Sequence, residues 1–328
     1  MAEATKSVYV AIAVDVGIAI SKFVAAGFSG SSGMLTEGIH SVVDAGIATL
    51  LLVGMARSRK PADAAHPFGY AQELYFWTTV VALLLFAAGG GMSAYEGVNG
   101  LLHPKAPEAP YWNYAVLVIS AALGTYSLAV SRAQLLQSRP GEGLWRAILA
   151  SKDPRSFSVL LVDIGDLIGV SLAFLGVLLS QVFDSPYPDP IAALGIGLVL
   201  AGIAAFLANE SRHLLIGESV DPALRDDIRA LAEAEEAVAE VRDPLTMQLG
   251  PDEVMLAMGL RFREGLATAD LERSLGRVER AIRAKHPKIR RIFLEIESDR
   301  RRADGPGTES EIEPEPSPTT TTPPEPGP

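Results

Sequence analysis

Six long apolar stretches constrain what this chain can fold into more than any other feature of its sequence. An α-helix rises about 1.5 Å per residue and the hydrocarbon core of a bilayer is about 30 Å thick, so about 20 mostly apolar residues span it. The stretches that reach or approach this length are Val8 to Phe28, Leu35 to Ala56, Leu74 to Leu102, Tyr111 to Val130, Phe157 to Phe183 and Ile191 to Leu207. They predict an α-helical membrane protein with six transmembrane helices, and the start of the chain predicts no removable signal peptide.

Positive charge is concentrated in the loops on one side of the predicted membrane. The loops on that side hold Arg57, Arg59, Lys60, Arg132, Arg139, Arg146, Lys152 and Arg155, whereas the opposite loops hold Lys105 alone. An excess of Lys and Arg marks the cytoplasmic side, so both termini are expected in the cytoplasm. The richness in Ala, Gly and Arg is compatible with a bacterial source, and the expected location is a bacterial plasma membrane.

A soluble segment follows the last apolar stretch. Residues 222–236 predict an amphipathic helix, and a weaker strand is expected in AVAEVRDPLTMQL. Apolar residues alternate from Val254 to Phe262 with the period of a half-buried strand, a second helix opens at Thr268, and IRRIFLEIES predicts a last strand. The order α-β-β-α-β predicts a small α+β domain, metallochaperone-like or ferredoxin-like, with its helices on one face of the sheet.

These patterns divide the chain into three parts. We expect a six-span transmembrane domain over residues 1–212, a cytoplasmic α+β domain over 213–298 and an acidic tail rich in Pro and Thr over 299–328. After Arg302 the tail holds acids and no Lys or Arg, namely Asp304, Glu309, Glu311, Glu313, Glu315 and Glu325, so it supplies six of the eleven net negative charges. Its composition predicts disorder.

Composition also excludes several classes of function. The chain has no cysteine, so disulfides and thiolate metal ligands are excluded and any metal site must use His and carboxylate oxygens. No nucleophile–base set or Gly-rich phosphate loop stands out, since Gly89, Gly90 and Gly91 lie within an apolar stretch, where small residues let helices approach closely. We expect no enzyme, no permanent cofactor and no nucleic-acid partner.

The second apolar stretch contains the polar sequence TEGIHSVVDAG. Residues three and four apart share a helix face, so Glu37, His40, Ser41 and Asp44 form one stripe. A charged group at the bilayer centre costs about 2.5–3.5 kcal/mol on insertion scales, so this stripe is not expected to face lipid. It is either a polar seam that hydrogen-bonds helices together or part of a metal site.

The fifth stretch supplies a second pair of acids, Asp163 and Asp166, which share a helix face. A His and carboxylates from two helices suit zinc, cobalt, manganese or iron(II). Because such ligands must lose protons to bind metal, the site has a physical basis for exchanging metal against protons. Asp15, inside the first stretch, is a candidate for helix packing or proton handling.

Several motifs together resemble the cation diffusion facilitator family. They are GSSGMLTEGIHSVVDAG, RKPADAAHPFGYAQELYFW, SKDPRSFSVLLVDIGDLIG and PDPIAALGIGLVLAGI, and the HPFGY and SKDP segments are most similar to the zinc-transporter-nine-like branch. The resemblance covers roughly residues 6–298. It implies a dimeric antiporter of divalent metal and protons, with six spans and a cytoplasmic α/β domain.

The resemblance also implies a ligand set. It makes His40, Asp44 and Asp163 transport-site ligands, but Val159 stands where the family commonly has a His, and Val162 where the similar branch often has a Glu. Asp166, Glu37 or a water could supply the fourth ligand. Asp166 ranks first, and the alternative is that it faces a neighbouring span.

A second family site would lie in the loop between the second and third stretches. Asp63 and His66 match its pattern, but Tyr70 stands where a third His would be, so a turn built by His66-Pro67 with Gly69 is the favoured alternative. The soluble segment holds one His, His286, expected at a solvated helix end. We therefore predict no strong metal site there.

The resulting hypothesis is a homodimeric membrane transporter that exports a divalent cation, with zinc first, in exchange for protons. Its partners would be the ion, protons, membrane lipid and a second copy of the chain. One alternative keeps the transport but changes the ion to manganese, iron(II) or cobalt. The other is a non-transporting, metal-sensing membrane scaffold with an incomplete site.

Overall fold

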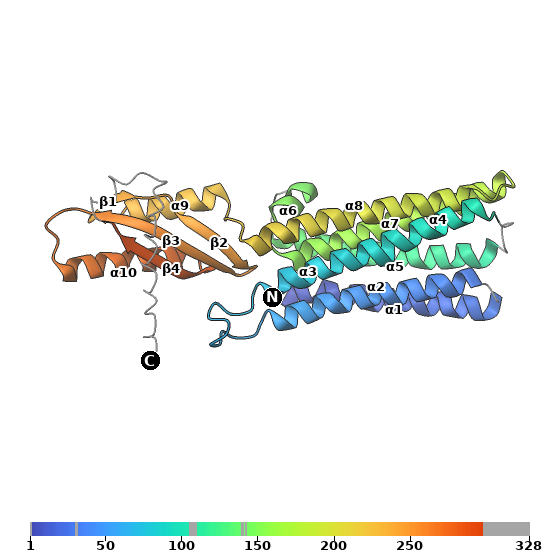
Figure 1. Cartoon of the computed structure of the whole chain (residues 1–328), viewed down its shortest axis with the longest axis horizontal. Coiled ribbons are helices and arrows are strands. Elements are labelled where there is room, and N and C mark those ends of the chain that lie inside the picture. The colour runs from blue at the N-terminus through green and yellow to red at the C-terminus, as the bar shows by residue number, and fades with distance from the viewer. Residues whose placement is uncertain (1, 30–31, 105–109, 139–140, 142, 298–328) are drawn as a thin grey trace, which may run out of the picture.

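The computed structural model describes residues 2–29, 32–104, 110–138, 141 and 143–297. Some side chains inside helices lie outside that description, among them those of residues 32–40. The predicted tail at 299–328 also lies outside it. A bundle of long helices and a small sheet domain lie end to end, and α1 begins at the end of the bundle nearest the sheet domain (Figure 1). This placement fits an even number of crossings.

The bundle contains most of the helical residues. Its elements are α1 (Ala2–Ser29), α2 (Ser32–Arg57), α3 (Glu73–Leu84), η1 (Leu85–Gly91), α4 (Met92–Leu102), α5 (Pro110–Ser138), α6 (Leu144–Ala150), α7 (Pro154–Val182) and α8 (Pro188–Ile216). α1 packs against α2 and α5, α7 packs against α5 and α8, and α3 and α4 lie along α8.

Five of the six predicted spans are confirmed as helices long and apolar enough to cross a membrane. In the described part of the chain these are Val8–Ala25, Glu73–Leu102, Tyr114–Gln137, Pro154–Val182 and Pro188–Ile216. The stretch predicted as the second span is the helix α2, 26 residues long, but it is not among the five, so the count of six stays a prediction.

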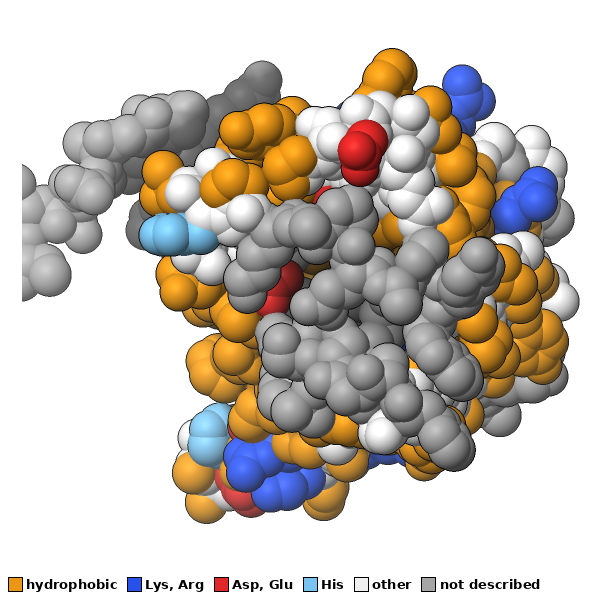
Figure 2. Space-filling view, turned by 90° about the vertical axis from the view of Figure 1, so that its right-hand side faces the viewer, with side chains coloured by type: hydrophobic (Ala, Val, Ile, Leu, Met, Phe, Trp, Pro, Cys, Tyr) orange, Lys and Arg blue, Asp and Glu red, His pale blue; other side chains and the backbone are white. Residues whose placement is uncertain are grey.

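The outside of the bundle is apolar. Leu198 on α8 is 77% exposed, and Val118 and Tyr126 on α5 are also exposed. Figure 2, which looks onto the end of the bundle away from the sheet, shows hydrophobic side chains around much of the visible rim. Exposing so large an apolar surface to water is unfavourable, and a lipid environment around the bundle explains it.

The third span is one continuous helical rod in which η1, a π-helical segment, joins α3 to α4. Its glycines allow a close approach to α8, as the sequence predicted. A Cβ on Gly90 would lie 3.2 Å from the carbonyl oxygen of Gly197, and a Cβ on Gly197 would lie 2.9 Å from that of Gly90. Neither position has room for a side chain.

The sixth predicted span continues further than the sequence indicated. α8 runs to Ile216, and Gly217 ends it with a φ of 106°, a conformation that glycine adopts without steric cost. The predicted division after residue 212 therefore falls inside this helix, and the domain limits remain a proposal.

The sheet domain has one more strand than predicted. Its elements are α9 (Pro222–Glu233), β1 (Val238–Val241), β2 (Leu245–Gly250), β3 (Glu253–Phe262), α10 (Thr268–Lys285) and β4 (Ile289–Ile296). β3 is the central strand: β4 pairs with it in parallel, and β1 and β2 both pair with β3 in the antiparallel direction. The order is α-β-β-β-α-β, and the predicted order α-β-β-α-β was wrong at the segment AVAEVRDPLTMQL.

The physical reason for this correction is a proline. β1 and β2 follow one another along the edge of β3 opposite β4, because Val241 pairs with Leu260 and Leu245 pairs with Ala257. Pro244 lies between them and has no N–H to donate to the ladder, so one long edge strand becomes two short ones.

The helices cover one face of the sheet, as predicted. Leu256 and Leu260 on β3 are fully buried and share a core with Ile228 of α9 and Ile282 of α10. His286 at the end of α10 was expected in solvent, but its Nε2 lies 2.6 Å from Oδ2 of Asp227 on α9, so it helps to join the two helices.

We predict that Gly197→Val destabilises the bundle by about 1–3 kcal/mol, the usual cost of overpacking. The added side chain would collide with the backbone of η1 at Gly90. Thermal unfolding of the purified protein in detergent measures the effect. The matched control is Gly202→Val on the same helix, where a Cβ meets nothing within 4 Å. Equal melting temperatures for the two variants would contradict the prediction.

Candidate metal site

Four carboxylates lie inside the bundle on three helices: Asp15 on α1, Asp44 on α2, and Asp163 and Asp166 on α7. Asp166 interacts electrostatically with the other three, and Asp15 does so with Asp44 and Asp163. None of them is exposed. Asp166 of the fifth predicted span therefore lies within electrostatic range of Asp44 of the second.

Asp163 is held by two serines of α5. Asp163 is 6% exposed, its Oδ1 accepts a hydrogen bond of 2.9 Å from Ser127 Oγ, and its Oδ2 accepts one of 2.6 Å from Ser131 Oγ. α7 begins at Pro154, so Asp163 lies roughly 14 Å along the helix axis from that end. The sequence reasoning missed both serines, although two polar residues one turn apart in an apolar helix were a usable signal.

A lysine also accompanies the carboxylates. Lys22 on α1 is partly buried and interacts electrostatically with Asp15 and Asp166. A cation inside an apolar bundle is expensive unless carboxylates face it. The sequence reasoning missed Lys22 as well, and the signal was a charge in the middle of the first apolar stretch.

The remaining candidate ligands are less fully described. Glu37 and His40 belong to α2, but their side chains are outside the described part of the structure. Val159 is 6% exposed and lies in the hydrophobic core, and Val162 packs against that core, so neither position offers a ligand. Among the side chains that are described, no three of His, Asp and Glu form a group that could hold an ion.

The cluster has a clear electrostatic consequence. Ionised carboxylates close together in a medium of low dielectric repel one another and lose hydration, so the arrangement needs compensation. Lys22 and the two serine hydroxyls provide part of it. A divalent cation, which prefers carboxylate and imidazole ligands in such sites, or protons would provide the rest.

The loop between α2 and α3 forms a turn around Asp63. Its Oδ1 accepts hydrogen bonds from the backbone N–H groups of Ala65 and His66, at 3.0 and 2.7 Å, and its Oδ2 accepts one of 2.7 Å from the Tyr70 hydroxyl. Gly69 has a φ of 84°. The tyrosine and backbone hydrogen bonds lower the pKa of Asp63 below its usual value. This geometry favours the turn that was the alternative to a loop metal site.

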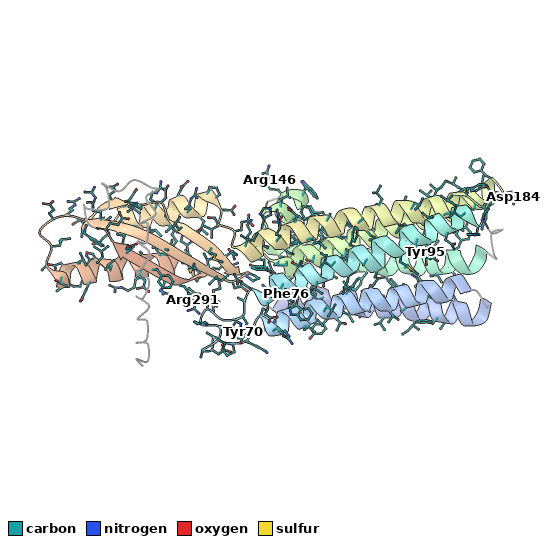
Figure 3. All side chains as sticks on the ribbon, in the orientation of Figure 1. Tyr70, Phe76, Tyr95, Arg146, Asp184 and Arg291 are labelled. Carbon is teal, nitrogen blue, oxygen red and sulfur yellow. The ribbon has the colours of Figure 1, made fainter. Side chains whose placement is uncertain are left out.

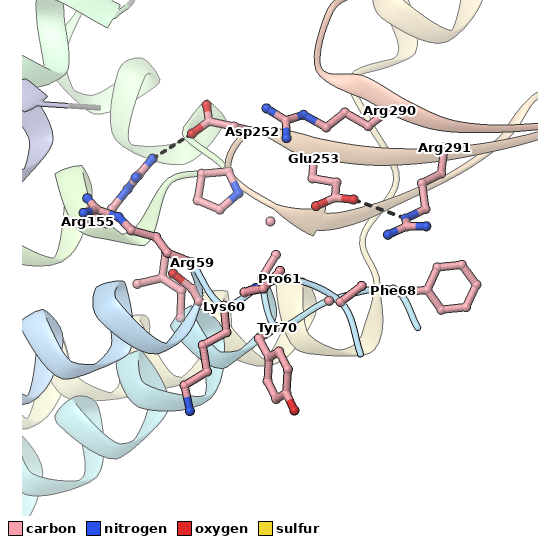
Figure 4. Close-up of a pocket in the computed structure, with 17 residues that line it drawn as sticks. Arg59, Lys60, Pro61, Phe68, Tyr70, Arg155, Asp252, Glu253, Arg290 and Arg291 are labelled. Atoms are coloured by element: carbon pink, nitrogen blue, oxygen red, sulfur yellow. Dashed lines mark hydrogen bonds and ion pairs between the residues drawn. The ribbon is translucent and has the colours of Figure 1, made fainter. Parts of the chain in front are cut away.

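A pocket of about 560 Å³ lies where the bundle meets the sheet domain (Figure 4). Arg155, at the base of α7, donates to Asp153 at 2.7 Å and to Asp252 of the β2–β3 turn at 3.3 Å. Arg291 of β4 pairs with Glu253 on another wall of the pocket. The helix that carries two of the four carboxylates is therefore tied at its base to the sheet domain.

Comparison with known proteins gives a consistent result. Residues 8–216 match the model of the cation efflux transmembrane domain. The chain is 30% identical over 78% of its length to the proton-coupled zinc antiporter SLC30A9, mitochondrial, of Mus musculus, and covers 46% of that protein. It is 27% identical over 76% of its length to metal tolerance protein C4 of Arabidopsis thaliana, covering 55% of it. It is 28% identical over 61% of its length to the manganese efflux system protein MneP of Bacillus subtilis, covering 65% of it.

The chain thus spans about half the length of the first two of these relatives. The matched part includes Asp15, Asp44, Asp163 and Asp166.

We predict that Tyr70→Phe raises the pKa of Asp63, because the tyrosine hydroxyl is the largest cause of its depression. A carboxylate with a lowered folded pKa stabilises the turn above its unfolded pKa, and this stabilisation is lost as the pH falls through the folded pKa. As the pH falls, Tyr70→Phe should therefore lose the stabilisation by ionised Asp63 at a higher pH than the unchanged protein. Carbon NMR of labelled aspartate measures the titration. Tyr126→Phe on α5 is the control, and equal curves for the two variants would contradict the assignment.

Proposed function

The chain belongs to the cation efflux family, and on that premise we propose that it is a transporter that moves a divalent metal ion out of the cytoplasm in exchange for protons. The observation that carries the proposal is the cluster of Asp15, Asp44, Asp163 and Asp166 inside an apolar bundle. Intramembrane acids that face one another across helices mark ion and proton pathways.

In this proposal the ion binds between α2 and α7. Asp44 and Asp163 are ligands, His40 supplies the nitrogen, and Asp166 is the fourth ligand because it interacts with both acids. Glu37, on the same predicted face of α2, is the alternative. Lys22 is a cation that can remain near the carboxylates when the metal leaves.

The same groups supply a basis for proton coupling. Carboxylates and an imidazole bind metal only without their protons, so metal arrival releases protons and metal departure takes them up. Exchange across the membrane then requires the cluster to open to one side at a time. The bond between Arg155 and Asp252 joins α7 to the sheet domain, so movements of the two are coupled.

Zinc is the first candidate substrate. It suits a site of imidazole and carboxylates, and the relative with 30% identity is named a proton-coupled zinc antiporter. Manganese is the second, because a valine at position 159 removes a nitrogen ligand that the family pattern supplies, and oxygen-rich sites suit manganese. The relative from Bacillus subtilis is named a manganese efflux protein.

Three further features belong to the proposal. A second copy of the chain would form a homodimer. The Lys and Arg of the loops beside the sheet domain would face the cytoplasm, which puts both termini there, and a bacterial plasma membrane is the proposed location although the mammalian relative is named as mitochondrial. Asp63 and His66 would shape the loop rather than bind an ion.

We predict that Asp44→Asn and Asp163→Asn each lower metal-driven proton flux by more than about 100-fold, beyond the usual effect of outer-shell partners. Each change removes a charged ligand and keeps the shape of the side chain. The measurement is internal pH of vesicles that contain the purified protein, with zinc, manganese, iron(II) or cobalt outside.

The matched control is Asp184→Asn, at the end of the bundle away from the sheet domain (Figure 3). It should transport like the unchanged protein. If folded protein shows no flux with any of the four metals, the transporter proposal fails and a non-transporting scaffold remains.

We also predict that Val159→His raises the kcat/KM for zinc several-fold relative to that for manganese. An imidazole at this position, one turn before Asp163, would restore a nitrogen ligand that zinc prefers. Val159→Gln is the control, because it adds a polar side chain of similar size without an imidazole. A ratio that stays the same in both variants would show that position 159 does not set the choice of metal.

A further inference from the structure

We propose that Ser127 and Ser131 of α5 are positioning residues that aim the Asp163 carboxylate at the transported ion. The inference rests on the proposed function, because it assumes that Asp163 is a ligand. It adds a second layer to the site, contributed by a helix on which the sequence reasoning placed no site residue.

The geometry is that of a two-point clamp. Ser127 donates to Oδ1 at 2.9 Å and Ser131 donates to Oδ2 at 2.6 Å, so each carboxylate oxygen has its own hydroxyl. The serines are one helical turn apart, which matches two donors to the two oxygens of one carboxylate. They are 2% and 1% exposed, so water does not compete for these bonds.

The clamp leaves the carboxylate able to bind metal. An ionised carboxylate has about four lone-pair sites, and the two hydroxyls occupy one on each oxygen. In this proposal the transported ion binds the remaining lone pairs. Hydrogen-bonded partners of this kind fix the orientation of metal ligands, and their loss typically costs about 10–100-fold in metal affinity.

Burial alone does not explain the two bonds. Ser120 on the same helix is also buried, as are Ser158 and Ser211, and among the described residues the hydroxyls of these three have no hydrogen-bond partner. A buried serine in this bundle is therefore not automatically paired. Ser131 Oγ also lies 3.2 Å from the carbonyl oxygen of Leu128, but its contact with the Asp163 carboxylate is the shorter one, at 2.6 Å.

The first test compares the double variant Ser127→Ala, Ser131→Ala with Ser120→Ala, using the full chain in lipid nanodiscs and vesicles. Titration calorimetry with zinc and with manganese should give a Kd about 10–100-fold weaker in the double variant and an unchanged Kd in Ser120→Ala. In vesicles KM should rise by a similar factor with little loss of kcat, because the ligands themselves remain. Ser131→Thr in the Ser127→Ala background should recover more affinity than Ser131→Ala, since threonine keeps the hydroxyl.

The second test is a cycle with Asp163→Asn, which separates action through Asp163 from a general loosening of the helices. In that background, removal of the serines should change the Kd no further. Suppose that the unchanged protein transports metal, and that the double serine variant binds metal as tightly as Ser120→Ala or more tightly. This outcome overturns the inference about the serines and leaves the proposed function standing. Absence of metal binding and flux in the unchanged, folded protein overturns both.

Discussion

The repulsion between carboxylates inside the bundle is the interaction on which the rest of the structure depends. Asp166 lies within electrostatic range of Asp15, Asp44 and Asp163, and Asp15 within range of Asp44 and Asp163, where apolar side chains exclude most water. Such a cluster is stable only with partners of opposite charge, with protons or with hydrogen-bond donors. Lys22 and the serines of α5 meet part of that need at all times. In the proposed function, a divalent cation or protons supply the unmet part in turn.

The acids lie on helices that pack against one another, so the packing of these helices offsets part of the cost of burying the carboxylates. α1 packs against α2 and α5, α7 packs against α5 and α8, and α7 also touches α1 and α2, so the three helices that carry the acids are neighbours. The close contact of Gly90 with Gly197 binds the third span to α8 on the other side. The outside of the bundle remains apolar, and the charged groups are confined to its interior.

The features that could be predicted from the sequence are those that depend on residues close together along the chain. Five spans were predictable because crossing a bilayer depends on local composition, and the strand β3 was predictable because burial alternates along it. Pro244 was also visible in the sequence, but that it divides one edge strand into β1 and β2 follows only from the pairing of both strands with β3. The stripe that contains Asp44 and the pair Asp163 and Asp166 stood out as acids in apolar helices. Their partners Lys22, Ser127 and Ser131 were also polar residues in apolar stretches, but which acids they accompany depends on tertiary packing.

The serine clamp also bears on how the site can open. Asp163 is bonded to α5, and Arg155 at the base of the same helix is bonded to the sheet domain through Asp252. α5 and α7 are therefore linked at the depth of the acidic cluster, and α7 is anchored at its base. Asp44 belongs to α2, which packs against α1. A shift of the pair α1–α2 against the pair α5–α7 changes the distance between Asp44 and Asp163 without breaking either serine bond. Because α1 also packs against α5, such a shift would slide α1 along α5.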